Sequence, residues 1–135
     1  MRAILADQNN EGHVAALVRR LQGEPWREFW EGLRLSVLTF ADLGLLPETP
    51  DVLLWQACQQ HGAILITINR NADGPDSLEA TIRQQNTPTS LPVMTLANPD
   101  RLMQERDYAE RVVEQLLVYL LDIDNYRGSG RLYLP

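Results

Sequence analysis

The sequence predicts one α/β domain with three layers, α/β/α, around a mostly parallel sheet of four to five strands. Short apolar runs that suit buried strands alternate along the chain with segments whose apolar residues recur at helical spacing. A chain of 135 residues is long enough for one hydrophobic core and too short for two α/β units of ordinary size. Strands joined by helices favour right-handed crossovers, so we expect the carboxyl ends of the strands to share one edge of the sheet.

The first strand is expected at residues 2–6, which are almost continuously apolar, as a central strand covered on both faces should be. Apolar residues at helical spacing over residues 11–21 predict the first helix. Asn9 or Asn10 can cap the start of this helix, and Gly23 can end it.

Residues 24–32 place three aromatic side chains, Trp26, Phe29 and Trp30, among charged residues. This composition indicates either a short amphipathic turn that lies over the core or a surface that contacts a partner, since Trp and Arg are enriched at interface centres. The second strand is expected at residues 33–40, which are rich in Val, Leu and Thr.

The later elements follow from the same patterns. Asp51 falls in the first turn of a helix, where the helix dipole favours a negative charge, and Ser77 or Asp76 can cap another helix. Pro92 marks either an edge strand or the start of a strand. Helices are expected at 51–61, 77–85 and 100–124, and strands at 63–68 and 91–96. Residues 1–125 then form the domain, and residues 126–135 form an extended arm that pairs with a strand or with a partner subunit.

Composition limits the possible function classes. The formal charge of -6 argues against a general polyanion binder, because nonspecific nucleic-acid affinity comes mainly from Lys and Arg that neutralise phosphates. All twelve basic residues are Arg, either by compositional drift or because the fork of donors suits carboxylates or phosphates. Cys58, the single cysteine, lies in an apolar helical pattern that favours a buried core residue. No signal segment or membrane-spanning run occurs, which favours a cytoplasmic protein without a membrane partner.

Acidic and amide residues follow the predicted strands at the edge where a site should lie. Asp7 ends the first strand, Asp51 opens the helix before the third strand, and Asn69, Asn71 and Asp73 follow the third strand. Carboxylates without His or Cys favour a hard cation such as magnesium or manganese, which takes oxygen ligands. Such an ion can activate water and stabilise the charge that develops on a phosphodiester.

Each of these residues also has a structural explanation. Asp7 can simply cap the helix that follows it, and Asp51 can serve only to stabilise the first turn of its helix. Asp42 suits a turn, whereas Asp73 and Asp76 suit a solvated loop.

The chain resembles the PIN-like nuclease family, in particular its small branch related to VapC-type toxins. The resemblance rests on four motifs over roughly residues 3 to 96, which read Asp7-Gln8-Asn9, Asp42-Leu43-Gly44-Leu45, Asp51 and Thr67-Ile68-Asn69-Arg70-Asn71. It implies a PIN-like fold and a metal-dependent ribonuclease acting on single-stranded RNA, with metal ligands at Asp7, Asp51 and the loop after the third strand. It also implies an antitoxin-like partner.

The sequence departs from the family at three of these positions. Gln8, Asn69 and Asn71 stand where the family has Glu and two Asp. An amide can bind a cation through its carbonyl oxygen but adds no charge, so affinity for a dication should fall. Three hypotheses follow: an active ribonuclease with Asp7 and Asp51 as catalytic residues, a catalytically degenerate PIN-like binding or regulatory module that acts as a homodimer, or an unrelated doubly wound domain that binds a small ligand.

Overall fold

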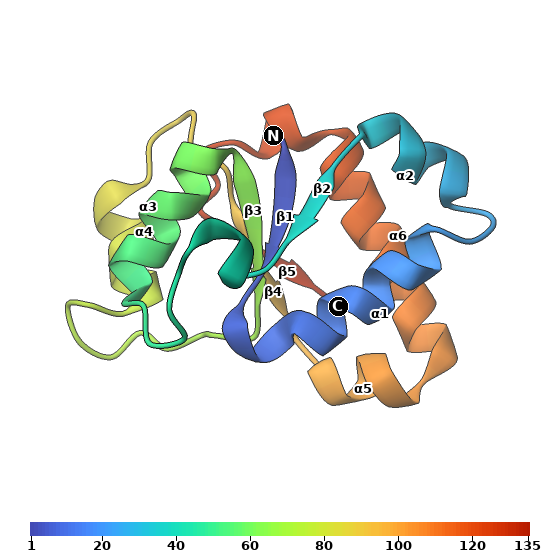
Figure 1. Ribbon diagram of the computed structural model, residues 1–135, viewed down its shortest axis with the longest axis horizontal. Helices are drawn as coiled ribbons and strands as arrows, with labels where there is room; N and C mark the ends of the chain where they lie inside the picture. The colour runs from blue at the N-terminus through green and yellow to red at the C-terminus, as the bar shows by residue number, and fades with distance from the viewer.

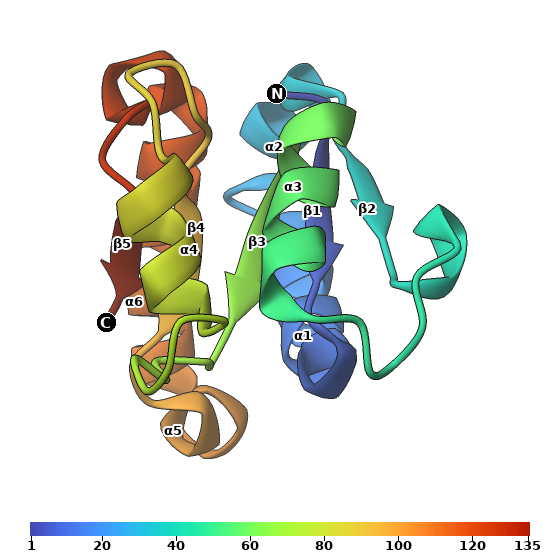
Figure 2. The same ribbon diagram turned by 90° about the vertical axis from the view of Figure 1, so that its left-hand side faces the viewer.

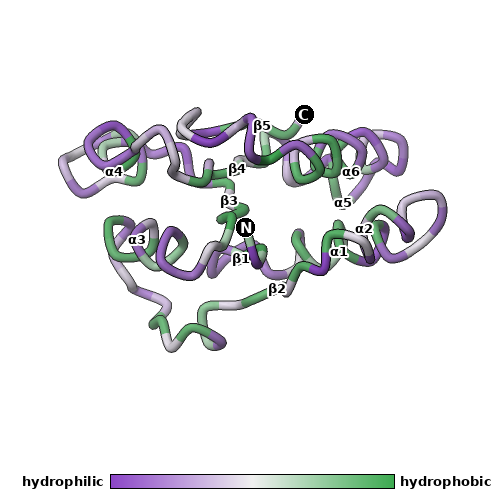
Figure 3. The backbone as a smooth tube through the Cα atoms, turned by 90° about the horizontal axis from the view of Figure 1, so that it is seen from above, coloured by the Kyte–Doolittle hydropathy of each residue, from purple (hydrophilic) through white to green (hydrophobic).

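The computed structural model describes residues 1–135 and confirms the three-layer α/β/α architecture. A five-stranded, all-parallel sheet has the order β2-β1-β3-β4-β5, where the strands are β1 (Ala3–Ala6), β2 (Ser36–Leu38), β3 (Ala63–Thr67), β4 (Val93–Leu96) and β5 (Arg131–Leu134). One face is covered by α3 (Asp51–His61) and α4 (Leu78–Gln85), and the other by α1 (Glu11–Leu21), α2 (Arg27–Leu33), α5 (Pro99–Gln104) and α6 (Arg106–Leu121) (Figures 1 and 3). None of these helices has the length and apolar character that crossing a bilayer requires.

Alternation along β1 divides the core into two clusters, one on each face of the sheet. Ala3 and Leu5 pack with the α3 and α4 side, whereas Ile4 and Ala6 pack with the α1 and α6 side. All four residues are buried, as a strand with neighbours on both sides and helices on both faces requires. The first strand therefore ends inside the sheet, and Asp7 follows it at the carboxyl edge.

Two helices have the bounds that the sequence predicts, α1 and α3. Ser77 caps α4 as expected, because its hydroxyl accepts a hydrogen bond from the backbone N–H of Ala80 at 3.1 Å. Asn10 precedes α1, but its side chain makes no capping hydrogen bond to that helix. The buried Asn10 side chain instead accepts a hydrogen bond from the Ile68 backbone N–H, just beyond the end of β3.

Three segments differ from the sequence-based expectations. Residues 27–33 form α2 rather than a short turn, and the second strand is confined to β2, because Arg34 takes a left-handed conformation with φ 53° between them. The long C-terminal helix is divided into α5 and α6 at Glu105, whose backbone is extended. Helical periodicity continues through such a break, so the pattern alone did not reveal it.

The C-terminal arm becomes β5 and pairs in parallel with β4, whose strand start follows Pro92. β4 is therefore an interior strand with β3 on its other side. The turn into β5 requires glycine at Gly128, where φ is 85° and an added Cβ would lie 3.0 Å from the Cα of Pro88. Figure 2 shows β5 at the end of the sheet opposite β2.

Cys58 lies in the core beneath α3 and is 2% exposed. Burial, with a smaller contribution from the charge of Asp7, raises the pKa of the Cys58 thiol from 9.0 to about 12. The folded protein thus keeps this proton over a pH range in which the unfolded chain loses it. Stability is lost as pH rises from the unfolded pKa toward the folded pKa, because the unfolded state binds fewer protons there.

We expect the free energy of unfolding of the native protein to fall more steeply than that of Cys58→Ala above about pH 9, by at most about 1.4 kcal/mol per pH unit. Urea titrations at a series of pH values would measure the difference. A thiol reagent should also label native Cys58 only after unfolding, since the reactive species is the thiolate. Parallel pH profiles for the two proteins, or rapid labelling of the folded protein, would contradict this expectation.

Candidate functional site

The strand order changes direction between β1 and β3. The chain leaves β1 toward β2 and then returns past β1 to build β3, β4 and β5. In doubly wound sheets, ligands bind outside the carboxyl ends of the two strands that flank such a switch point. Here Asp7 follows β1, and Thr67 is the last residue of β3. The carboxyl ends of these two strands lie on the lower edge of the sheet in Figure 1.

Asp7 is held by hydrogen bonds from both sides of this switch point. Its Oδ1 accepts from the backbone N–H of Gln8 at 2.7 Å, and its Oδ2 accepts from the Thr67 hydroxyl at 2.5 Å. The Asp7 backbone N–H donates to the carbonyl of Ile66 at 3.0 Å. Asp7 does cap the short 3₁₀ helix Gln8–Asn10, but each carboxylate oxygen keeps a lone pair that these contacts do not use.

Asp51 reaches the same edge from the start of α3. Its Oδ2 accepts a hydrogen bond from the Asn69 side-chain nitrogen at 3.2 Å. The Asn69 backbone N–H donates to the Thr67 hydroxyl at 2.9 Å, and Thr67 in turn donates to Asp7. One continuous chain of hydrogen bonds therefore connects the two carboxylates through Thr67 and Asn69.

A cleft of about 250 Å³ opens at this point, and we call it the acidic cleft. Its only charged lining residues are Asp7 and Asp51. Asn10 supports the wall between β1 and β3: its side chain is buried, accepts from the Ile68 backbone N–H at 3.2 Å and lies 3.2 Å from the His13 ring nitrogen Nδ1. The lining is Asp7, Gln8, Asn9, Asn10, Phe40, Pro47, Thr49, Asp51, Leu54, Ile68 and Asn69.

The sequence predicted five metal ligands, and the structure brings three of them together. Asp7, Asp51 and Asn69 line the acidic cleft, whereas Asn71 and Asp73 do not. The Asn69 carbonyl oxygen accepts from the Asn71 backbone at 2.8 Å, and the Asn71 carbonyl oxygen accepts from the Asp73 backbone at 2.9 Å. The side chains of Asn69 and Asn71 thus form successive Asx turns along an exposed loop. A short amide side chain readily accepts a hydrogen bond from the backbone N–H two residues later.

The two other candidate acidic residues, Asp42 and Asp76, lie outside the acidic cleft. Asp42 accepts from the Thr39 backbone at 2.8 Å and from the Thr39 hydroxyl at 3.1 Å, as a turn residue does. Asp76 is exposed in the loop before α4. No group of three or more His, Cys, Asp or Glu side chains gathers in an arrangement that could hold a metal ion.

Arg131, at the start of β5, holds the loop of residues 68–73, which we call the site loop, by a hydrogen bond to its backbone. Its side chain is 5% exposed, and Nη1 donates to the Asn69 backbone carbonyl at 2.8 Å and to the Thr95 hydroxyl at 2.6 Å. Nε donates to Glu79 of α4 at 3.0 Å, so the guanidinium also forms an ion pair. Through Arg131, β5 therefore holds the backbone of Asn69, whose side chain donates to Asp51.

Sequence reasoning missed Arg131 and Asn10 as site supports. Arg131 lies in a tail whose pairing could not be read from periodicity, and a buried arginine is recognisable only once its acidic and carbonyl partners are known. Asn10 carried a signal, since an amide at a strand edge suits backbone hydrogen bonds, but the helix cap accounted for it equally well.

Comparison of the chain with family models, with characterised proteins and with solved structures finds no match. The geometry of the acidic cleft is therefore the basis for a functional proposal.

Proposed function

We propose that this chain is a PIN-like, metal-dependent ribonuclease domain with a reduced acidic site, in which Asp7 and Asp51 hold one magnesium or manganese ion. The observation that carries the proposal is the meeting of these two carboxylates, from β1 and α3, in one cleft at the switch point of the sheet. The resemblance of the motifs around Asp7, Asp51 and Thr67 to toxin-type PIN domains supports the same assignment.

The donor set suits a hydrated dication. Magnesium is commonly bound through one or two carboxylates and keeps several waters, so Asp7 and Asp51 meet the minimum requirement. Asn69 adds an amide at the same cleft, although its carbonyl oxygen accepts from the Asn71 backbone. The lack of a third acidic ligand is consistent with weak binding that a substrate phosphate strengthens.

The protein residues of the cleft hold the two carboxylates in place. Thr67 and the Gln8 backbone fix the Asp7 carboxylate, while Asn69 orients Asp51. A bound dication supplies charge neutralisation for the phosphodiester and an activated water for its hydrolysis. Without such neutralisation an RNA phosphate would meet two negative charges and no basic lining residue.

Single-stranded RNA is the substrate class that the motif resemblance implies. Gln8 and Asn9 line the cleft, and amides can both donate to and accept from unpaired base edges. A nuclease of the toxin type would also need an antitoxin-like protein to hold it inactive, and that partner belongs to this proposal.

The second candidate is a catalytically degenerate PIN-like module that acts as a homodimer. It is favoured by the hydrogen bond from Asn69 to Asp51, which gives one oxygen of the carboxylate a partner without a cation. The apolar surface over α2 and the end of α6 offers a contact face for a second copy, since Phe29, Val118 and Leu121 are 53%, 48% and 52% exposed and line a shared groove.

Replacing Asn69 by Asp distinguishes the two candidates. If the cleft binds metal, Asn69→Asp should raise manganese affinity on the order of tenfold, because the third carboxylate adds a charged ligand. It should also lower the melting temperature without metal, since it replaces the hydrogen bond to Asp51 by repulsion, and manganese should restore it. Calorimetric titration and thermal unfolding would measure both effects.

The matched control is Asn125→Asp, which breaks a similar, exposed hydrogen bond from Asn125 in the 3₁₀ helix Ile123–Tyr126 to Asp122 before it, outside the cleft. Manganese affinity should be the same as in the native protein. Absence of manganese binding in both the native protein and Asn69→Asp would favour the degenerate module, whose sedimentation behaviour should then be that of a dimer.

A further inference from the structure

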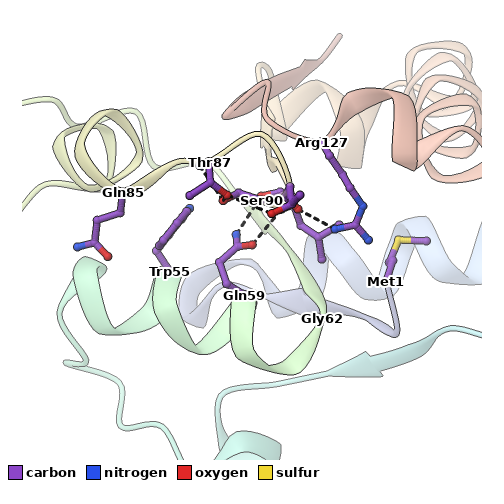
Figure 4. Close-up of a pocket in the computed structure, with 10 residues that line it drawn as sticks. Met1, Trp55, Gln59, Gly62, Gln85, Thr87, Ser90 and Arg127 are labelled. Carbon is purple, nitrogen blue, oxygen red and sulfur yellow. Dashed lines mark hydrogen bonds between the residues drawn. The ribbon is translucent and has the colours of Figure 1, made fainter.

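A second cavity, of about 400 Å³, lies at the amino-terminal edge of the sheet, opposite the acidic cleft. We call it the amino-edge cavity. Its walls are the middle and C-terminal part of α3, the loop from α4 to β4 and the segment before β5 (Figure 4). Its volume falls in the range of small-molecule sites.

One wall holds a buried hydrogen-bond donor without a partner. Trp55 is 5% exposed, and its indole N–H makes no hydrogen bond within the protein although it is buried. Figure 4 shows the Trp55 ring between Gln85 and Gln59, with its nitrogen-bearing end toward Thr87. Such a donor is costly to leave unpaired, so an acceptor atom on a ligand would satisfy it.

The polar groups beside Trp55 differ in how many of their hydrogen-bonding atoms already have partners within the protein. Both side-chain polar atoms of Gln59 bond the Leu91 backbone, at 2.9 Å each, and form a fixed floor. Gln85 accepts from Gln56 at 2.9 Å, which leaves its NH₂ group as a donor.

Arg127 supplies positive charge at the opposite wall of the cavity. Its Nε donates to Asp124 and its Nη1 donates to the Thr89 carbonyl, both at 2.8 Å, whereas Nη2 makes no hydrogen bond within the protein. No Asp or Glu lines the cavity, although the chain carries a net charge of -6. The cavity therefore combines a guanidinium, which is paired with Asp124 but has Nη2 unused, with a neutral donor and an aromatic wall.

We infer that the amino-edge cavity binds a small organic anion, whose carboxylate or phosphate group lies at Arg127 and whose remaining acceptor atom takes the Trp55 indole N–H. The volume limits the ligand to a compact molecule, and the indole favours one with a flat apolar part. Arg127 favours an oxyanion over a neutral ligand, because its free nitrogen can make a charge-assisted hydrogen bond.

The Trp55 indole resonance in a nitrogen–proton NMR spectrum reports on this site directly. Titrations with inorganic phosphate, uridine 5′-monophosphate and succinate separate phosphate from carboxylate ligands. We expect a saturable shift of the Trp55 indole peak with at least one of these probes. Trp55→Phe keeps an aromatic side chain, although a smaller one, and removes the indole donor. Its affinity for that probe, measured by calorimetry, should be about three- to tenfold weaker. Arg127→Gln should weaken binding about tenfold or more.

Arg83→Gln is the charge-matched control, because Arg83 is exposed on α4 and does not line the cavity. It should bind the probe as the native protein does. A Trp55 indole peak that stays unchanged with all three probes at millimolar concentration would overturn the inference. Equal loss of binding in Arg127→Gln and Arg83→Gln would also overturn it, since the effect would then come from net charge alone.

Discussion

Under the proposed ribonuclease function, Asp7→Asn should abolish cleavage of single-stranded RNA in the presence of manganese or magnesium, with a loss of about a hundredfold or more in rate. Asp7 lies at the switch point of the sheet and is one of two charged residues that line the acidic cleft. The substitution keeps the shape of the side chain and removes half of the negative charge available to a cation. Gel-based cleavage of a labelled oligoribonucleotide would measure the rate.

The fold should survive this change, because an amide can replace the contacts of Asp7. Its carbonyl oxygen can accept from the Gln8 backbone, and its NH₂ group can donate to the Thr67 hydroxyl. The matched control is Asp42→Asn, which changes an exposed turn residue outside the cleft and should leave the rate unchanged. Cleavage that persists in Asp7→Asn, or metal-dependent cleavage lost equally in both variants, would contradict the proposed role.

Arg131→Met should lower the free energy of unfolding by about 2 to 3 kcal/mol, because it removes charge-assisted hydrogen bonds from a side chain that is 5% exposed. The loss stays in this range because the partner Glu79 is 33% exposed, so water can solvate its carboxylate once Arg131 is replaced. Methionine preserves most of the apolar stem, so lost packing contributes little. Urea unfolding followed by circular dichroism would measure the change.

The same variant should also loosen the site loop, because Arg131 holds the Asn69 carbonyl and the Thr95 hydroxyl. Amide exchange of residues 68–73 should therefore become faster relative to the rest of the sheet. Arg101→Met removes an exposed ion pair with Glu105 and should leave stability nearly unchanged. Equal stabilities of the native protein and Arg131→Met would show that the buried ion pair makes no net contribution.

The candidate site was largely predictable because strand ends in an α/β sheet have predictable positions. Asp7 ends a continuous apolar run, Asn69 follows another, and Asp51 begins a helix bounded by Pro50 and Gly62. Parallel strands joined by helices bring such residues to one edge whatever their separation in sequence. The meeting of Asp7, Asp51 and Asn69 in one cleft follows from this rule.

The failures concern residues whose partners are distant or whose backbone can turn in more than one way. Asn71 and Asp73 lie in the loop that follows β3, but Asx turns direct them along an exposed path, and only the folded loop reveals this. Arg34 interrupts what reads as one strand, because a left-handed residue leaves no trace in hydropathy.

By itself, the sequence determined the alternation of strands and helices, the parallel sheet and the edge where acidic residues collect, because burial and periodicity are local properties of the chain. Only the tertiary structure decided that the C-terminal segment becomes β5 and brings Arg131 beneath Asn69. It also decided that Asn69 donates to Asp51, and that Trp55 lines a cavity while its indole N–H has no hydrogen-bond partner. These contacts join residues far apart in the chain, and their free energies depend on burial and partner geometry that no local pattern contains.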